Sequence, residues 1–192
     1  MTTEKMNNFI NYLHTISKLS DNTKVDLKNC LTTFKFPKNK TILEQGQICN
    51  YLYFVDKGLL RLFYYREGKD ITDYFATEQN IIGGIDSFFS RKPSDKIIET
   101  IEPCNLVAIS FDNLEKLYQK HHDLERVGRI LSVGAFLSMQ KRLFAIQFHP
   151  AKQRYQELLE SSPDILQRVP LGHIASYLGI TQVTLSRIRS QK

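Results

Sequence analysis

The stretch that decides the fold is LGHIASYLGITQVTLSRIR, residues 171–189. Its apolar residues recur at helical spacing on both sides of a glycine, which predicts two short helices joined by a tight turn. Ala175 is small where the helices would cross, Gly179 suits a left-handed turn, and Thr181 is a good N-cap for the second helix. The shared core is expected to contain Ile174, Leu178, Ile180, Leu185 and Ile188. The pattern predicts a helix-turn-helix.

The second helix would present a polar face to the major groove of double-stranded DNA, the partner that this motif predicts. Gln182 can pair with adenine, Arg187 with guanine, and Val183 can touch a thymine methyl group. The expected DNA-contacting residues are Thr181, Gln182, Val183, Thr184, Ser186, Arg187 and Arg189, with Lys152 and Arg154 of the preceding helix as phosphate contacts. The alternative interpretation of these last two is that they are ordinary solvated charges.

The distribution of charge supports a polyanionic partner. The 192-residue chain carries a net charge of +6. Residues 126–192 hold ten Lys or Arg against three Asp or Glu, a local surplus of +7. All of the excess positive charge therefore lies in the last third of the chain, as expected where one end of a protein meets nucleic acid.

The first part of the chain predicts a helical lead-in followed by short strands. Residues 6–19 have helical periodicity, and Ser20 with Asp21 offers a cap for a second helix. Beyond them, runs rich in β-branched and aromatic residues alternate with glycine-containing turns. The expected strands are Thr32–Phe36, Thr41–Leu43, Tyr51–Val55, Leu59–Tyr65, Ile71–Ala76, Ile97–Ile101 and Leu106–Ser110. Their regular spacing indicates a β-barrel or roll.

A long helix is expected from about His122 to Phe148, closed by Pro150 and roughly 40 Å long. Its apolar residues cover more than one face, which is typical of a helix that packs against its own domain and against a second copy of itself. The residues expected at the dimer interface are Val127, Ile130, Leu131, Gly134, Leu137 and Phe144. The sequence therefore predicts a homodimer.

The order of roll, long helix and terminal helix-turn-helix resembles the catabolite activator and fumarate-nitrate regulator (Crp/Fnr) family, in the form typical of Bacteroidetes-type bacteria. The motifs that carry the resemblance are ILEQG at 42–46, YFVDKG at 53–58, IASYLGIT at 174–181 and TLSRIR at 184–189. The resemblance implies an α+β fold and a dimeric transcription regulator, with RNA polymerase as a further partner. It divides the chain into a cyclic-nucleotide-binding-like sensor domain at 1–120, a dimerisation helix at 121–149 and a helix-turn-helix domain at 150–192.

The chain departs from this family at the effector pocket, which the resemblance places at Gly83, Gly84, Ile85, Asp86, Ser94 and Asp95. Gly84 stands where cyclic-AMP-binding members have a ribose-binding glutamate, and Ser94-Asp95 replaces their phosphate-binding arginine and serine. A carboxylate at the phosphate position would repel the ligand, although Arg91 or Lys92 could supply a cation nearby. We therefore expect an unknown effector other than cyclic AMP, or none, and the sequence identifies no certain cofactor. The chain also has too few residues after the helix-turn-helix for the β-wing of many members.

Other classes of protein are less well supported. Three scattered cysteines predict neither a disulfide framework nor an iron-sulfur cluster. A cupin-like metalloenzyme would need histidines inside the roll, yet all five histidines lie outside residues 41–110. No catalytic or metal site is therefore predicted. The remaining alternative is a sensing or scaffolding module whose C-terminal helices bind a protein. With no apolar segment of membrane-spanning length, the chain is expected in the cytoplasm.

Overall fold

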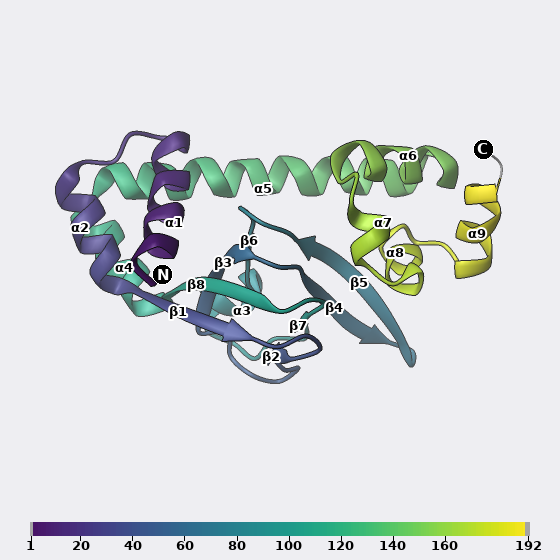
Figure 1. The fold of residues 1–192 in the computed structure, drawn as a ribbon, viewed down its shortest axis with the longest axis horizontal. Helices are drawn as coiled ribbons and strands as arrows, with labels where there is room; N and C mark the ends of the chain where they lie inside the picture. Colours follow the sequence, from purple (N-terminus) through teal and green to yellow (C-terminus); the bar gives the residue numbers. More distant parts are fainter. Residues whose placement is uncertain (1, 191–192) are drawn as a thin grey trace.

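The computed structural model describes residues 2–190 and begins with the two expected helices. The first, α1 (Thr2–Ile16), starts and ends earlier than its apolar spacing indicates, and α2 (Asp21–Cys30) follows. The Ser20 side chain accepts a hydrogen bond from the Thr23 amide at 3.2 Å, so it is the predicted cap of α2. Figure 1 shows both helices at one end of the long helix.

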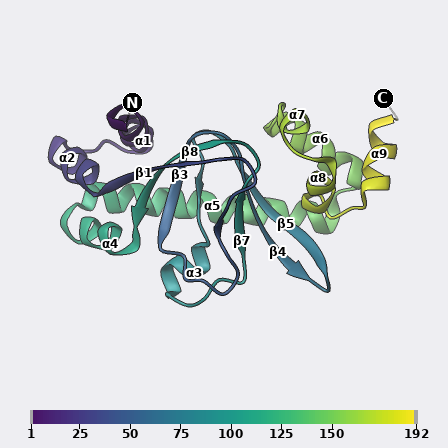
Figure 2. The same ribbon diagram turned by 60° about the horizontal axis from the view of Figure 1, so that its bottom comes forward.

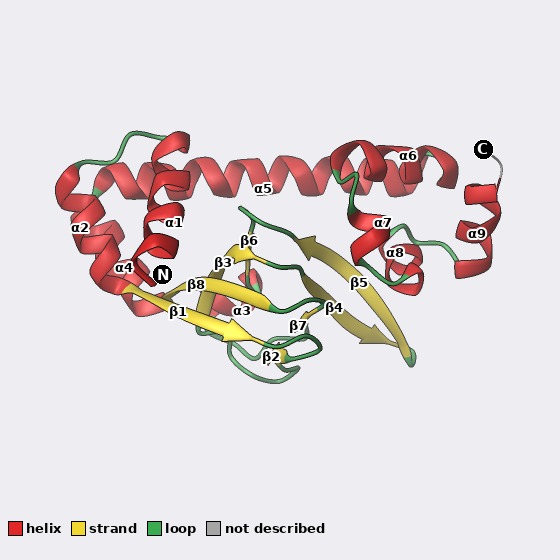
Figure 3. Ribbon diagram, in the orientation of Figure 1, coloured by secondary structure: helices red, strands yellow, loops and turns green. Residues whose placement is uncertain are grey.

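Eight antiparallel strands form the roll as two four-stranded sheets, ordered β1-β8-β3-β6 and β2-β7-β4-β5. The strands are β1 (Leu31–Phe36), β2 (Thr41–Leu43), β3 (Tyr51–Lys57), β4 (Leu60–Arg66), β5 (Lys69–Ala76), β6 (Ile81–Ile82), β7 (Ile97–Thr100) and β8 (Cys104–Ser110). Figure 3 shows the two sheets beneath the long helix. The first apolar core includes Val55, Leu106 and Val107 of these strands together with residues of the helices packed on the roll.

All seven predicted strands are confirmed, whereas two elements of the roll are not predicted. The strand β6 has two residues, which is too short to show an alternating pattern. The helix α3 (Ile85–Ser90) lies within the segment of the predicted effector pocket, between two predicted strands. Six residues make fewer than two helical turns, so periodicity cannot reveal such a helix.

Helices dominate the rest of the chain. After α4 (Phe111–Lys120), the helix α5 (His122–Phe148) has the predicted bounds and runs along the whole molecule in Figure 1. The C-terminal part contains α6 (Ala151–Ser161), α7 (Ile165–Arg168), α8 (Leu171–Tyr177) and α9 (Gln182–Ser190). The sequence predicts three helices here, and the additional α7 is a single turn that follows Pro163.

The C-terminal helices dock against the roll of the same chain, as Figure 2 shows from a second direction. A second apolar core joins Leu59, Phe75 and Ile101 of the roll to residues of the C-terminal helices. The members from these helices include Tyr155, Leu158, Ile165, Val169, Ile174, Leu178 and Leu185. This shared core fixes where the helix-turn-helix lies relative to the sensor.

Candidate nucleic-acid interface, dimer face and effector pocket

The two helices α8 and α9 have the geometry of the predicted helix-turn-helix. Ile174 and Leu185 are fully buried between them, and Gly179 has a φ of 67°, the left-handed conformation expected at the turn. The Ile180 amide donates to the Ala175 carbonyl at 3.0 Å and closes the turn. Thr181 accepts from the Thr184 amide at 3.1 Å, which caps α9. The sequence signals at the turn and the cap are thus confirmed.

The outer face of α9 is free of protein contacts that would block a ligand. Gln182, Ser186, Arg187 and Arg189 are exposed, and Val183 is 61% exposed. In the part of the chain that the structure describes, neither arginine of this face forms an ion pair. Their charges are therefore available to nucleic acid, and their base and phosphate contacts stay predictions.

The two basic residues of α6 that are predicted to contact phosphate, Lys152 and Arg154, differ in their exposure. Lys152 is exposed. Arg154 is half-buried and donates to the Leu178 carbonyl at 3.1 Å and to the His149 carbonyl at 2.7 Å. It thereby holds the start of α6 to the end of α8. The phosphate contacts of Lys152 and Arg154 both stay predictions, and Arg154 also hydrogen-bonds two backbone carbonyls of its own chain.

The predicted dimer residues on α5 do not all face outward. Val127 is only 1% exposed and belongs to the core of its own roll, so its assignment to the interface is wrong. Leu131 packs against the same core, and Ile130 is half-buried. Helical periodicity finds both apolar stripes of α5 but does not say which one the chain itself covers.

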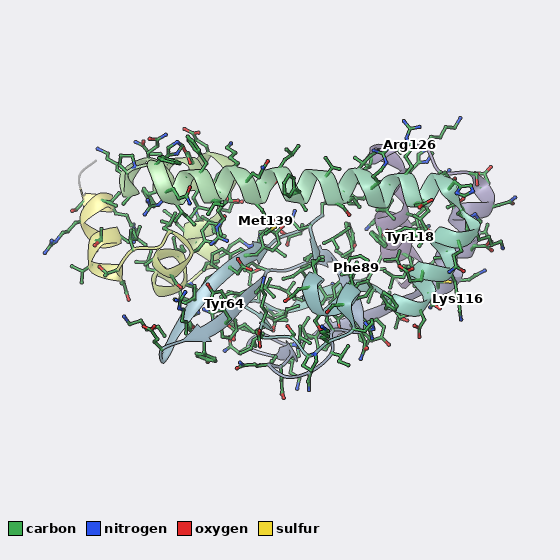
Figure 4. The ribbon with its side chains drawn as sticks, turned by 180° about the vertical axis from the view of Figure 1, so that it is seen from behind. Tyr64, Phe89, Lys116, Tyr118, Arg126 and Met139 are labelled. Atoms are coloured by element: carbon green, nitrogen blue, oxygen red, sulfur yellow. The ribbon has the colours of Figure 1, made fainter. Side chains whose placement is uncertain are left out.

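The opposite side of α5 carries an exposed apolar stripe that includes the predicted Leu137 and Phe144. Met139, labelled on α5 in Figure 4, is 70% exposed. We define the apolar stripe as Val133, Phe136, Leu137, Leu143, Phe144 and Phe148, each at least 49% exposed. An ideal Cβ at Gly134 would meet nothing within 4 Å, so this part of α5 is open.

The predicted effector-pocket residues divide into three buried and three exposed ones. A Cβ at Gly83 would lie 2.6 Å from Leu52 Cδ2, and a Cβ at Gly84 would lie 3.1 Å from Leu43 Cδ2. Ser94 is 1% exposed and its hydroxyl bonds the backbone of Lys96. The other members, Ile85, Asp86 and Asp95, are exposed. Side chains of the roll occupy the space beside both glycines.

Arg91, one of the two cations considered for the phosphate position, is bonded within the roll. Its guanidinium donates to the Cys49 carbonyl at 2.9 Å and to the Asn50 side chain at 2.6 Å. It also lies 4.6 Å from the centre of the Phe111 ring. These contacts tie α3 to the start of β3, and Lys92, the other cation considered, is exposed.

Sequence reasoning missed a set of buried polar contacts that joins the roll to α8. Arg61 of β4 is 3% exposed and pairs with Asp70 at 2.9 Å and Glu99 at 2.8 Å. It also donates to Nδ1 of His173. Burial, and then the charge of Arg61, lower the pKa of His173 below its ordinary value of 6.5, so neutral imidazole is the form that accepts this bond.

Two further arginines, Arg142 and Arg168, also join the roll to the C-terminal helices. Arg142 of α5 bonds Asp73 and also donates to the carbonyls of Thr72 and Tyr177, each at 3.3 Å. It thus connects α5, β5 and α8.

Arg168 of α7 binds Glu78 at 2.9 Å and Glu102 at 2.8 Å. Burial opposes the charge of Glu78, but hydrogen bonds from Arg168 and the Gly58 amide prevail and lower the pKa of Glu78 to about 2. No local sequence signal reveals such pairs, because their partners are distant in sequence.

Comparisons with known proteins found relatives of this chain both in sequence and in fold. A family model for the cyclic nucleotide-binding domain matches residues 33–121. The cAMP-activated global transcriptional regulator CRP of Salmonella typhimurium is 23% identical over 172 residues, covering 80% of this chain and 79% of that relative. FixK2 from Bradyrhizobium japonicum has a TM-score of 0.71 at 20% identity, covering 84% of this chain and 83% of its own. A crp/fnr-family structure from Eubacterium rectale has a TM-score of 0.72 at 20% identity, covering 93% and 85%.

Within residues 2–190, no cluster of three or more His, Cys, Asp or Glu side chains is arranged to hold a metal ion. Over the same residues, none of the helices is both long and apolar enough to cross a membrane.

Proposed function

We propose that this chain, whose residues 33–121 match a cyclic nucleotide-binding domain, is a dimeric transcription regulator of the CRP/FNR type that binds double-stranded DNA through α8 and α9. It is a regulator rather than an enzyme, acts in the cytoplasm, and has RNA polymerase as a further partner. Its units are the sensor at 1–120, the dimerisation helix at 121–149 and the DNA-binding domain at 150–192.

The exposed face of α9 is the observation that carries this proposal. Arg187 and Arg189 project from a helix that is capped and packed by α8, so their positions are held by a rigid element rather than by a loop. Arginine binds guanine and phosphate, while Gln182 and Val183 on the same face suit adenine and thymine. Gln182 and Val183 lie in the first turn of α9, the part of a recognition helix that reads base edges in the major groove, and Arg187 and Arg189 follow in its last turn.

The apolar stripe on α5 supports the dimer. Six large apolar side chains are exposed along one face of α5. A monomer normally exposes such side chains singly rather than in one continuous patch. A second copy with the same stripe covers it by twofold packing of the two α5 helices. The two copies of α9 would then meet successive major grooves, which predicts a palindromic operator with half-sites about 10 base pairs apart.

The effector is not cyclic AMP in this proposal. Gly84 carries no side chain that could hold a ribose, and Leu43 and Leu52 pack close to Gly84 and Gly83. No arginine replaces the phosphate ligand, because Arg91 is bonded to Cys49 and Asn50. The chain therefore responds to a different small molecule or acts without one.

Salt-dependent binding to duplex DNA tests this function. Full-length protein should bind a random 30-base-pair duplex at low salt and lose affinity as salt rises, because counterions are released from phosphates. The double variant Arg187→Ala/Arg189→Ala should bind much more weakly. The matched control is Arg66→Ala, since Arg66 is an exposed arginine at the end of β4. Equal loss in both variants would refute a specific role for α9, and no binding at low salt would favour a protein-binding module.

A further inference from the structure

A cavity of about 190 Å³ lies at the seam between the roll and the C-terminal helices. Its walls come from β5 and the turn after it, from the end of α6, and from α7 and α8. Figure 1 shows β5 running past α8 at this seam. A ligand here would touch both halves of the chain at once.

The polar lining of the cavity consists of hydroxyl and amide groups. The residues that provide them are Tyr74, Thr77, Asn80, Ser161, Ser162 and Tyr177. Within the described part of the chain, the hydroxyls of Tyr74, Ser162 and Tyr177 make no hydrogen bond to protein, so they are free to bind a ligand. None of the lining residues is a Lys, Arg, Asp or Glu. The site therefore suits an uncharged ligand rather than a phosphate or carboxylate.

The remaining walls are apolar and aromatic. Phe75 and Tyr177 lie with ring centroids 5.4 Å apart, and Ile165 contributes an aliphatic side. The cavity holds the volume of about six water molecules, which is below the roughly 300 Å³ of a pocket for a drug-sized ligand. We propose that this cavity binds a neutral, hydroxyl-rich molecule of monosaccharide size, and that this molecule is the effector.

The position of Tyr177 explains how such a ligand would act on the rest of the protein. The Arg142 guanidinium lies 4.4 Å from the centre of the Tyr177 ring and donates to the Tyr177 carbonyl at 3.3 Å. Arg142 belongs to α5, which carries the apolar stripe, and Tyr177 ends the first helix of the helix-turn-helix. A ligand that holds Tyr177 against β5 thereby biases the docking of α8 on the roll. This regulatory consequence rests on the proposed function, whereas ligand binding does not.

Calorimetry and amide NMR on the full chain test the site directly. The probes are D-glucose, D-galactose and D-ribose up to 10 mM, with glucose 6-phosphate and cyclic AMP as charged comparisons. At least one neutral sugar should bind and shift amide signals around Tyr74, Ser162 and Tyr177. Binding of none of the three sugars, or binding of the charged compounds alone, would overturn the proposal.

Two conservative substitutions show whether a sugar uses the cavity. In Tyr74→Phe/Tyr177→Phe the rings remain and only the unpaired hydroxyls are lost. Each neutral hydrogen bond removed weakens binding about 2- to 12-fold, so we expect a loss of about fivefold or more. The control is Tyr65→Phe, because Tyr65 is 56% exposed at the far end of β4. Equal affinity in the double variant and the control would refute the site.

The DNA measurement separates the site from its regulatory role. A saturating sugar should change the DNA affinity of the wild type about fivefold or more in either direction, and DNA should change the affinity for the sugar by the same factor. Sugar binding with unchanged DNA affinity would refute the effector role but leave the site in place. Absence of any DNA binding would refute the proposed function, while the sugar result would still decide the cavity.

Discussion

Replacing Arg168 with methionine should loosen the docking of the C-terminal helices on the roll. Arg168 makes four charged hydrogen bonds, two to Glu78 and two to Glu102. Side-chain exposures of 23% for Arg168, 40% for Glu78 and 29% for Glu102 mean that solvent screens both pairs. Exposed pairs contribute about 0–1 kcal/mol each, and bidentate geometry raises this, so Arg168→Met should lower the free energy of unfolding by about 1–2 kcal/mol.

The pH dependence identifies the pair responsible. The pKa of Glu78 is lowered from 4.5 to about 2 in the folded chain, so its contribution to stability is present above pH 4.5 and is lost as the pH falls toward 2. In Arg168→Met the pKa of Glu78 should rise toward its ordinary value of 4.5. The free energy of unfolding should therefore fall less steeply as the pH is lowered. Urea unfolding between pH 7 and pH 2.5 measures both effects, with Arg66→Met as the control. An unchanged pH slope, or a loss equal to that of the control, would refute the role assigned to Arg168.

Three further predictions concern α5 and the joint with α8. Leu137→Lys should convert a dimer of about twice 22.3 kDa into a folded monomer. Light scattering would report the mass and circular dichroism the retained fold, and a dimer that persists in this variant would argue against the apolar stripe as the interface. Gly128→Ala should destabilise the fold by about 1–3 kcal/mol, because its Cβ would lie far inside contact distance of Tyr118, which reaches α5 from α4 in Figure 4. Gly134→Ala is the comparison, because a Cβ there meets nothing within 4 Å in its own chain; equal thermal shifts would contradict the role of Tyr118. Because the pKa of His173 is lowered from 6.5, folding stability should fall as the pH drops below 6.5, and His173→Gln should reduce that dependence in chemical unfolding; an unaltered profile would exclude this histidine.

Much of the fold could be predicted because its elements are long or bounded by strong signals. The helix α5 has the predicted bounds because its apolar spacing is continuous up to Pro150. The turn at Gly179 and the cap at Thr181 follow from local backbone chemistry, which needs no knowledge of tertiary contacts. Elements of two to six residues, such as β6, α3 and α7, are too short to show a period.

The polar contacts that join the roll to the C-terminal helices could not be predicted, for a different reason. In the sequence, Arg61, Arg142 and Arg168 are indistinguishable from ordinary surface charges. Their carboxylate partners lie up to 90 residues away, and only the fold brings them together. The same limit applies to Val127, because apolar spacing does not show whether a stripe faces the chain's own core or a second copy.

Selection of binding sites from random duplexes is the most direct test of the central claim that α9 reads DNA. The wild type should select a palindromic sequence with half-sites about 10 base pairs apart. Arg187→Ala should lose about 1–3 kcal/mol of binding free energy and its preference at one symmetric pair of positions, while Lys152→Ala should weaken all sequences alike. Unchanged affinity and an unchanged consensus for Arg187→Ala would show that this helix does not read bases.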